Sequence, residues 1–336
     1  MEEAIITQSL TKKFNGFLAV DHINFEVKSG EIFGLLGPNG AGKTTTINML
    51  ITLLEPTEGT AYVSGFDIRK EPDKIRERIG VVFQDMTIDR NLTGYENMWL
   101  HGKLYNIPEK ELKRKIKELL EFVELEKWTN VELRKYSGGM IRRLEIARGL
   151  LHTPEILFLD EPTLGLDPQT RVHIWDYIKR TKEEQDMTIF LTTHYMDEAE
   201  KLCDRIAIID HGKIIAIGTP EQLKNMIGGD IIYITISKEN HGVKSFIEAI
   251  NSGISEKIKI VNTNTLAITV ENAPEKIPLI FEVARSNGVK ILEIKYSRPT
   301  LDDVFLQLTG RKLREEEGSF TDFVRRVMFM RRRRMR

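Results

Sequence analysis

One stretch of this sequence has the residue types and spacing of a phosphate-binding loop: Gly37-Pro38-Asn39-Gly40-Ala41-Gly42-Lys43-Thr44-Thr45. Its glycines let backbone N–H groups approach a phosphate without a Cβ in the way, and Lys43 adds a full positive charge. The hydroxyl of Thr44 is placed to ligate Mg²⁺. An apolar run precedes the loop and a segment without Gly or Pro follows it, so we predict strand, loop and helix in that order.

Two acids, Asp160 and Glu161, directly follow the apolar residues 156–159. At the carboxyl end of a buried strand, Asp160 would lie beside the phosphate loop and hold Mg²⁺. Glu161 would point elsewhere and could orient an attacking water as general base. Paired acids are also common on surfaces, but the apolar run before this pair favours the site. Gln84 likewise follows a predicted strand, 79–83, where it could reach a metal or a water.

Further polar groups follow at the starts of helices and the ends of strands. Ser137-Gly138-Gly139 precede a helical pattern and would give a second anion-binding arrangement, or else a plain helix cap. Asp167 lies in a tight turn that Pro168 closes. His194 ends the predicted strand 188–193 and is a candidate contact for a terminal phosphate, although a lone histidine is usually structural.

An aromatic pair, Phe14 and Phe17, lies near the N-terminus beside two lysines. Such a face could stack on a purine ring, or the rings could simply be buried in the core. The spacing does not decide between the two interpretations.

Composition sets limits on the class of protein. The 336 residues suggest two domains, or one large domain with an appendage. A single cysteine, Cys203, excludes an internal disulfide and fits a reducing compartment, and we interpret it as a packing residue. Charged residues open the chain, so we expect no signal peptide. No run approaches the roughly 20 apolar residues of a membrane span, which predicts a soluble or peripheral protein.

Charge is distributed unevenly along the chain. Residues 323–336 contain seven arginines and no acid, which leaves 42 basic against 50 acidic side chains in residues 1–322. An acidic body argues against broad nucleic-acid binding. The basic tail, 311–336, has an apolar helical stripe and would either bind anionic lipid or form a frayed, solvated end.

The order of the predicted elements gives the domain organisation. We predict an α/β domain over 1–228 with a helical subdomain at about 85–150, where residues 108–123 have the pattern of an amphipathic helix. The composition changes near Gly228-Gly229. Residues 229–310 then follow the order β-α-β-β-α-β, which is typical of a small ferredoxin-like α+β domain. That domain contains no chemical constellation, so we expect it to dock or regulate.

Together these motifs resemble the ATP-binding subunits of ABC transporters over nearly the whole chain. The phosphate loop resembles Walker A, Gln84 the Q-loop, Ser137-Gly138-Gly139 the ABC signature, and Asp160 with Glu161 Walker B and its catalytic glutamate. Asp167 matches the D-loop aspartate and His194 the switch histidine. Tyr136, Met140 and Arg142-Arg143-Leu144 around the signature, with the small second domain, resemble the daunorubicin-resistance-type exporter ATPases. Phe14 stands at the adenine-stacking position, where relatives usually have tyrosine.

The resemblance implies a P-loop NTPase cassette that binds ATP and Mg²⁺, with Thr44, Gln84 and Asp160 at the metal. It also implies a head-to-tail homodimer in which each site combines one subunit's Walker motifs with the other's Ser137–Gly139. A separate membrane permease would carry the substrate, and the chain would sit peripherally on the cytoplasmic face of the membrane. We therefore expect an exporter ATPase for drug-like or amphipathic molecules. A soluble ABC ATPase acting on ribosomes or DNA is the alternative, which the single cassette and the short segment between Gln84 and Ser137 disfavour.

Overall fold

The computed structural model describes residues 3–226, 228–237, 243–254, 257–262, 264–297 and 299–309. The basic tail lies outside the described residues. The rest forms two compact units, and the chain passes from the first to the second between Pro220 and Glu221. This division lies a few residues before the composition change near residue 228 where we expected it, because α8 (Pro220–Asn225) belongs almost wholly to the second unit.

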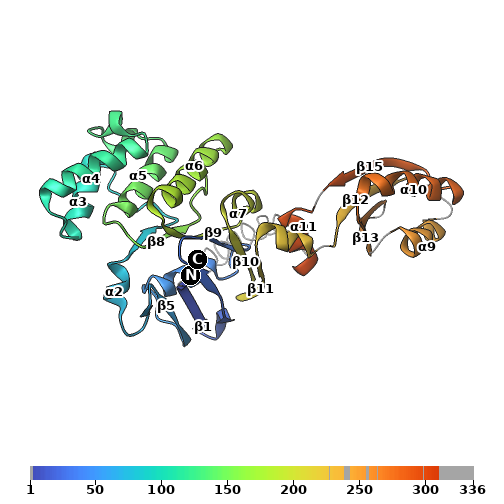
Figure 1. Cartoon of the computed structure of the whole chain (residues 1–336), viewed down its shortest axis with the longest axis horizontal. Helices are drawn as coiled ribbons and strands as arrows, with labels where there is room; N and C mark the ends of the chain where they lie inside the picture. The colour runs from blue at the N-terminus through green and yellow to red at the C-terminus, as the bar shows by residue number, and fades with distance from the viewer. Residues whose placement is uncertain are drawn as a thin grey trace, which may run out of the picture. The chain divides into compact units, whose positions relative to one another are not determined.

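The first unit is built around a six-stranded sheet in the order β11-β10-β4-β9-β8-β7 (Figure 1). All neighbouring pairs are parallel except the hairpin of β10 with β11 at one edge. Its strands are β4 (Ile32–Leu36), β7 (Ile79–Val82), β8 (Ile156–Asp160), β9 (Thr188–Thr193), β10 (Arg205–Asp210) and β11 (Lys213–Gly218). Every residue of β4, β8 and β9 is buried, as the continuous apolar runs of a parallel sheet predict.

A second, antiparallel sheet has the order β2-β1-β5-β6, and β3 also pairs with β1. Its strands are β1 (Glu3–Phe14), β2 (Phe17–Ile23), β3 (Glu26–Lys28), β5 (Glu58–Val63) and β6 (Phe66–Asp67). Strand β1 runs on to Phe14, so that Phe14 and Phe17 face each other across the β1–β2 turn.

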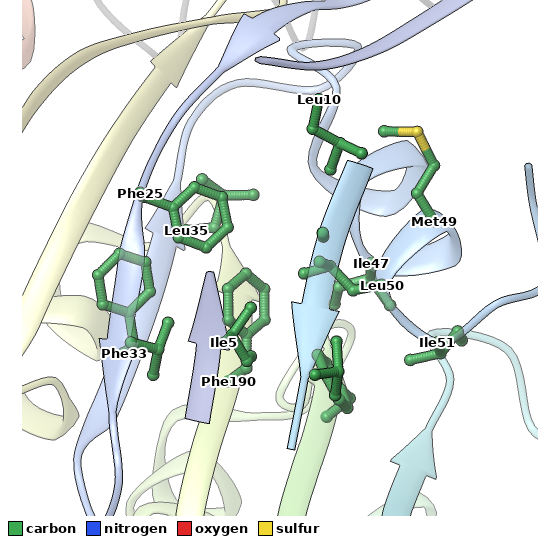
Figure 2. Close-up of a cluster of buried hydrophobic side chains, with 14 of the residues drawn as sticks. Ile5, Leu10, Phe25, Phe33, Leu35, Ile47, Met49, Leu50, Ile51 and Phe190 are labelled. Carbon is green, nitrogen blue, oxygen red and sulfur yellow. The ribbon is translucent and has the colours of Figure 1, made fainter. Parts of the chain in front are cut away.

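The main core joins both sheets and the first helix. Phe25, Phe33 and Phe190 stack on one another with centroid separations of 5.4 to 5.9 Å. Ile47 and Leu50 of α1 (Lys43–Leu50) belong to the same fully buried cluster, which Figure 2 shows. The core thus fixes the strand before the phosphate loop and the helix after it.

The remaining helices of the first unit include the expected helical insertion. They are α2 (Pro72–Arg76), α3 (Gly94–Leu104), α4 (Glu109–Phe122), α5 (Gly138–Leu150), α6 (Pro168–Gln185) and α7 (Met196–Leu202), with short 3-10 turns at Glu126–Trp128 and Leu133–Lys135. Helix α4 is amphipathic as predicted: Leu112, Ile116 and Leu120 are buried, and its outer face carries Lys–Glu and Arg–Glu pairs four residues apart. Among the described residues, no helix combines the length and the apolar character needed to cross a membrane.

The second unit has the predicted ferredoxin-like order. Its elements are β12 (Asp230–Ile236), α9 (Val243–Gly253), β13 (Lys257–Asn262), β14 (Thr265–Val270), α10 (Ala273–Ser286) and β15 (Ile291–Ser297). The sheet order is β13-β14-β12-β15, with every pair antiparallel. Phe246 and Ile250 of α9 and Ile280 of α10 bury one face of this sheet. A further helix that we did not predict, α11 (Leu301–Thr309), follows β15.

Candidate functional site

The phosphate loop connects β4 to α1 in a conformation that requires glycine. At Gly42, φ is 107°, and a Cβ there would lie 2.6 Å from the carbonyl oxygen of Ala19. At Gly37, a Cβ would lie 2.2 Å from the carbonyl oxygen of Ile209. Neighbouring backbone packs directly against the loop, so larger residues at these positions would displace it.

Lys43 begins α1 and is buried in the loop that precedes it. Its Nζ donates to the carbonyl oxygens of Gly37, at 2.8 Å, and Pro38, at 3.1 Å. The same atom lies 3.1 Å from Oε1 of Glu161, and both side chains are only 5% exposed. The carbonyl groups of the loop thus hold the Lys43 ammonium group opposite the carboxylate of Glu161, which directly follows β8.

Glu161 lies between two partners from different elements. Its second oxygen, Oε2, is 2.6 Å from Nδ1 of His194, which follows β9 directly. Burial by itself would raise the pKa of Glu161, but the hydrogen bond from His194 and the charge of Lys43 outweigh burial and lower the pKa below its usual value. The carboxylate is therefore ionised at neutral pH and held between His194 and Lys43.

The backbone of Glu161 explains why two adjacent acids face different ways. Its φ is 49°, in the left-handed region that non-glycine residues rarely adopt. The turned backbone is held by Thr192 of β9, whose carbonyl and hydroxyl oxygens both accept from the N–H of Glu161, at 3.2 and 3.1 Å. The divergence of Asp160 and Glu161 that we predicted from the sequence therefore has a structural cause.

Asp160 ends β8 beside the start of α1. Its Oδ1 accepts from the hydroxyl of Thr192, at 2.5 Å, and from that of Thr44, at 3.4 Å. Burial raises the pKa of Asp160, and the two hydroxyl bonds oppose that rise only in part. A carboxylate and a hydroxyl this close supply the hard oxygen donors that Mg²⁺ prefers, so the residues fit that ion.

A cavity of about 540 Å³ collects half of the predicted site residues. Its lining consists of Phe14, Phe17, Ala19, Asn39, Gly40, Gly42, Lys43, Thr44, Thr45, Gln84, Glu161 and Leu164. Phe14 is 42% exposed and Phe17 is 67% exposed, so neither ring is a core residue. The β1–β2 turn therefore presents aromatic rings at one side of the cavity, and the phosphate loop and Gln84 lie along it.

The lining does not include every predicted residue: it lacks Gly37, Pro38, Ala41, Asp160 and His194, and two whole motifs as well. Ser137 is the N-cap of α5, and its Oγ accepts from the N–H of Met140 at 3.3 Å; Gly138 and Gly139 form the first turn of that helix. Asp167 is the N-cap of α6 and accepts from the N–H of Thr170 at 3.0 Å. Within one chain, these caps are separate from the phosphate loop.

Sequence reasoning missed some residues that support the site. Thr192 holds both Asp160 and the backbone of Glu161, and Ala19 packs its carbonyl against the phosphate loop. Thr192 had a usable signal, because a side-chain hydroxyl in a fully buried strand needs a hydrogen-bond partner. The contact of Ala19 involves only backbone and has no signature in the sequence.

Two family models match the chain. Residues 20–164 match the model described as ABC transporter, and residues 218–309 match the C-terminal domain of ATP-binding proteins of the DrrA1-3-like type. Among curated proteins, a linearmycin resistance ATP-binding protein of Bacillus subtilis is 40% identical over 92% of this chain and 99% of its own length. A daunorubicin/doxorubicin resistance ATP-binding protein of Streptomyces peucetius is also 40% identical, over 91% of this chain and 92% of its own length.

Other matches come from export proteins and solved structures. A Nod factor export ATP-binding protein of Sinorhizobium fredii is 37% identical over 93% of this chain and 88% of its own. A solved dimeric ATP-binding cassette, in a post-hydrolysis state with ADP and Pi, is 30% identical with a TM-score of 0.58; the match covers 64% of this chain and 98% of that one. The solved structure of cbiO1 of Clostridium perfringens, part of an ABC transporter complex, is 27% identical with a TM-score of 0.63. That match covers 75% of this chain and 96% of cbiO1. These structures confirm the predicted cassette fold.

Proposed function

This chain belongs to the ATP-binding subunits of ABC transporters, of the daunorubicin-resistance type, and we propose that it hydrolyses ATP to power export of a drug-like or amphipathic substrate through a separate membrane permease. The family resemblance in its sequence is thereby confirmed. The family implies ATP hydrolysis, and its relatives include drug-resistance and Nod factor export proteins. The substrate, the permease and the residue roles below are our proposal.

The observation that carries the proposal is the buried contact of Glu161 with both Lys43 and His194. In this proposal Lys43 binds the ATP phosphates, and the Glu161 carboxylate accepts the proton of the attacking water. His194 holds that carboxylate in position and contacts the terminal phosphate. Gln84, which lines the same cavity, contacts the water or the metal.

Thr44 and Asp160, with Gln84, are the residues that would hold Mg²⁺. The bound ion would neutralise phosphate charge as the terminal phosphate leaves. The donor set supports this assignment because the Thr44 hydroxyl lies 3.4 Å from the Asp160 carboxylate, at the start of the helix that follows the phosphate loop.

We assign the adenine ring to Phe14, at the aromatic side of the cavity. The exposure of the ring supports stacking, since a base can cover an accessible face that the protein leaves uncovered. Lys12 Nζ lies over one face of the Phe14 ring, 5.2 Å from its centre, so a cation lies beside the aromatic side of the cavity.

A head-to-tail homodimer would complete each site. Ser137, Gly138 and Gly139 form a helix N-terminus that does not line their own chain's cavity, and in this model it would meet a phosphate held by another subunit. Asp167 begins α6 in the same way and would lie at the junction. Solved cassettes that resemble this chain are described as dimeric, which supports the model.

Peripheral attachment at the cytoplasmic face of the membrane follows from partnership with a permease. The experiment that tests the proposal is purification of the protein from its native membranes in mild detergent, together with an assay of Mg²⁺-dependent ATP hydrolysis. We expect turnover and a stoichiometric polytopic membrane protein. ATP hydrolysis with co-purifying ribosomes or nucleic acid would favour the soluble alternative, and no hydrolysis would refute the enzymatic assignment.

A further inference from the structure

Arg142 lies in α5, five residues after Ser137, and is only 7% exposed. Buried arginine is costly unless its donors are paired. Here the guanidinium group donates to four backbone carbonyls from outside the helix and pairs with one carboxylate, that of Glu145 three residues further along the same helix. Such a concentration of contacts on one side chain calls for an explanation beyond ordinary helix packing.

Three of the four carbonyls belong to the end of β8 and the turn after it. Nη2 donates to the carbonyl oxygens of Asp160, at 3.0 Å, and Glu161, at 3.3 Å, and Nε donates to that of Pro162 at 2.7 Å. Arg142 therefore binds the backbone carbonyls of Glu161 and of its two neighbours, and Thr192 accepts from the N–H of Glu161, whose φ is in the left-handed region. Together these hydrogen bonds fix the position of the Glu161 carboxylate.

The fourth carbonyl is that of Phe83, which lies between the end of β7 and Gln84. Nη1 donates to the carbonyl of Phe83 at 2.6 Å and lies 3.1 Å from Oε2 of Glu145. The other oxygen of Glu145 accepts from the N–H of Thr87 at 3.0 Å, in the segment after Gln84. One guanidinium group and its acidic partner therefore bracket the backbone of Gln84 as well as that of Glu161.

We propose that Arg142 is a positioning residue, which sets Glu161 and Gln84 at the correct distance from each other and from the helix that Ser137 caps. The inference rests on the proposed function, because it assigns Arg142 a part in ATP hydrolysis. Its planar fork reaches several acceptors at fixed angles, which the single ammonium group of lysine does not reproduce. Loss of the fork would let the Glu161 backbone relax, and small misplacements of a reacting group reduce turnover strongly.

The first test compares Arg142→Lys with wild type in steady-state ATP hydrolysis. We expect kcat to fall by about 10- to 100-fold while KM for ATP stays within about twofold, because phosphate binding depends on the loop and Lys43. The matched control is Arg143→Lys on the same helix. Arg143 donates to the carbonyl of Val123 and to the hydroxyl of Tyr177, away from the cavity, so its kcat should stay near wild type.

A double mutant separates positioning from a purely structural role. If Arg142 acts through Glu161, adding Arg142→Lys to Glu161→Gln should lower the residual turnover by much less than the roughly 10- to 100-fold expected in the wild-type background, since the base is already lost and only the placement of Gln84 remains to be affected. Multiplicative losses would overturn the inference, as would an unchanged kcat in Arg142→Lys. If Arg142→Lys does not fold, Glu145→Gln decides, because it keeps all four carbonyl contacts.

For Glu145→Gln we expect a smaller fall in kcat, about 3- to 10-fold, which also disappears in the Glu161→Gln background. An unchanged kcat, or a loss that multiplies, would overturn the inference. These outcomes differ from failure of the proposed function, which would appear as absence of hydrolysis in the wild-type protein itself.

Discussion

Glu161→Gln is the most direct test of the proposed chemistry. Glutamine has nearly the same shape and can still accept from His194, but it has no negative charge and does not accept the proton of an attacking water. The replaced carboxylate is 5% exposed, so bulk water has little access to take over its role. We expect kcat for ATP hydrolysis to fall by about 10²- to 10⁴-fold, which corresponds to about 3–5 kcal/mol of transition-state stabilisation.

Nucleotide binding should respond in the opposite direction. In the wild-type chain, Lys43 shares its ammonium group between two carbonyls and the Glu161 carboxylate, which a phosphate has to displace or share. Removal of the carboxylate frees that charge, so the affinity for ATP should be unchanged or up to about tenfold tighter. Equilibrium binding of a fluorescent ATP analogue measures this alongside a phosphate-release assay.

The matched control is Glu155→Gln, directly before the same strand. Glu155 is exposed and forms an ion pair with Arg78, and it does not line the cavity. Its turnover should stay near wild type. Near-normal hydrolysis in Glu161→Gln would refute the assignment of the general base, and loss of ATP binding in that variant would show that its pairing with Lys43 is structural.

Three further outcomes are expected. Ser137→Arg should abolish hydrolysis while an isolated subunit still binds nucleotide; full activity would contradict the composite site. Gly42→Ala should destabilise the loop by about 1–3 kcal/mol, since φ is 107° and the Cβ would meet the Ala19 carbonyl, and an unchanged thermal midpoint would contradict this. Burial, with Arg148 nearby, lowers the pKa of His101 from 6.5 to about 4, so the unfolded chain binds a proton first. Stability should therefore fall between pH 6.5 and 4, by up to about 3 kcal/mol, and His101→Gln should flatten this dependence in denaturant titrations.

The sequence was most informative where residues close together in the chain determine the backbone conformation. The glycines of the phosphate loop, the apolar strand before it and the alternation of strands and helices after Gly228 each specify a local structure. The ferredoxin-like topology followed because a β-α-β-β-α-β order leaves few sheet arrangements. Helix α11 was not predicted although Leu301, Val304 and Phe305 have helical spacing, because the β-α-β-β-α-β order ends at the strand before it.

Contacts between distant segments were not predictable in the same way. The acceptors of Arg142 are backbone carbonyls at Phe83 and at residues 160–162. Because every residue has a backbone carbonyl, the residue types in the sequence do not show which carbonyl accepts a hydrogen bond. An arginine on a helix is by default solvated, so its burial became visible only once two strand ends and α5 were placed together. The pairing of Glu161 with both Lys43 and His194 depends likewise on three elements that meet at one edge of the sheet.

The charge of the cavity gives an independent reason to expect more than one chain at the site. Among its lining residues, Lys43 is the one full cation, and Glu161 lies against it as an anion. A triphosphate carries several negative charges, so this near-neutral pair leaves most of them uncompensated. The helix N-terminus after the loop supplies a partial charge, and Mg²⁺ at Thr44 and Asp160 would supply two more. The backbone N–H groups of the phosphate loop add partial charges, and those at Ser137–Gly139, which do not line the same chain's cavity, would add more from a second subunit.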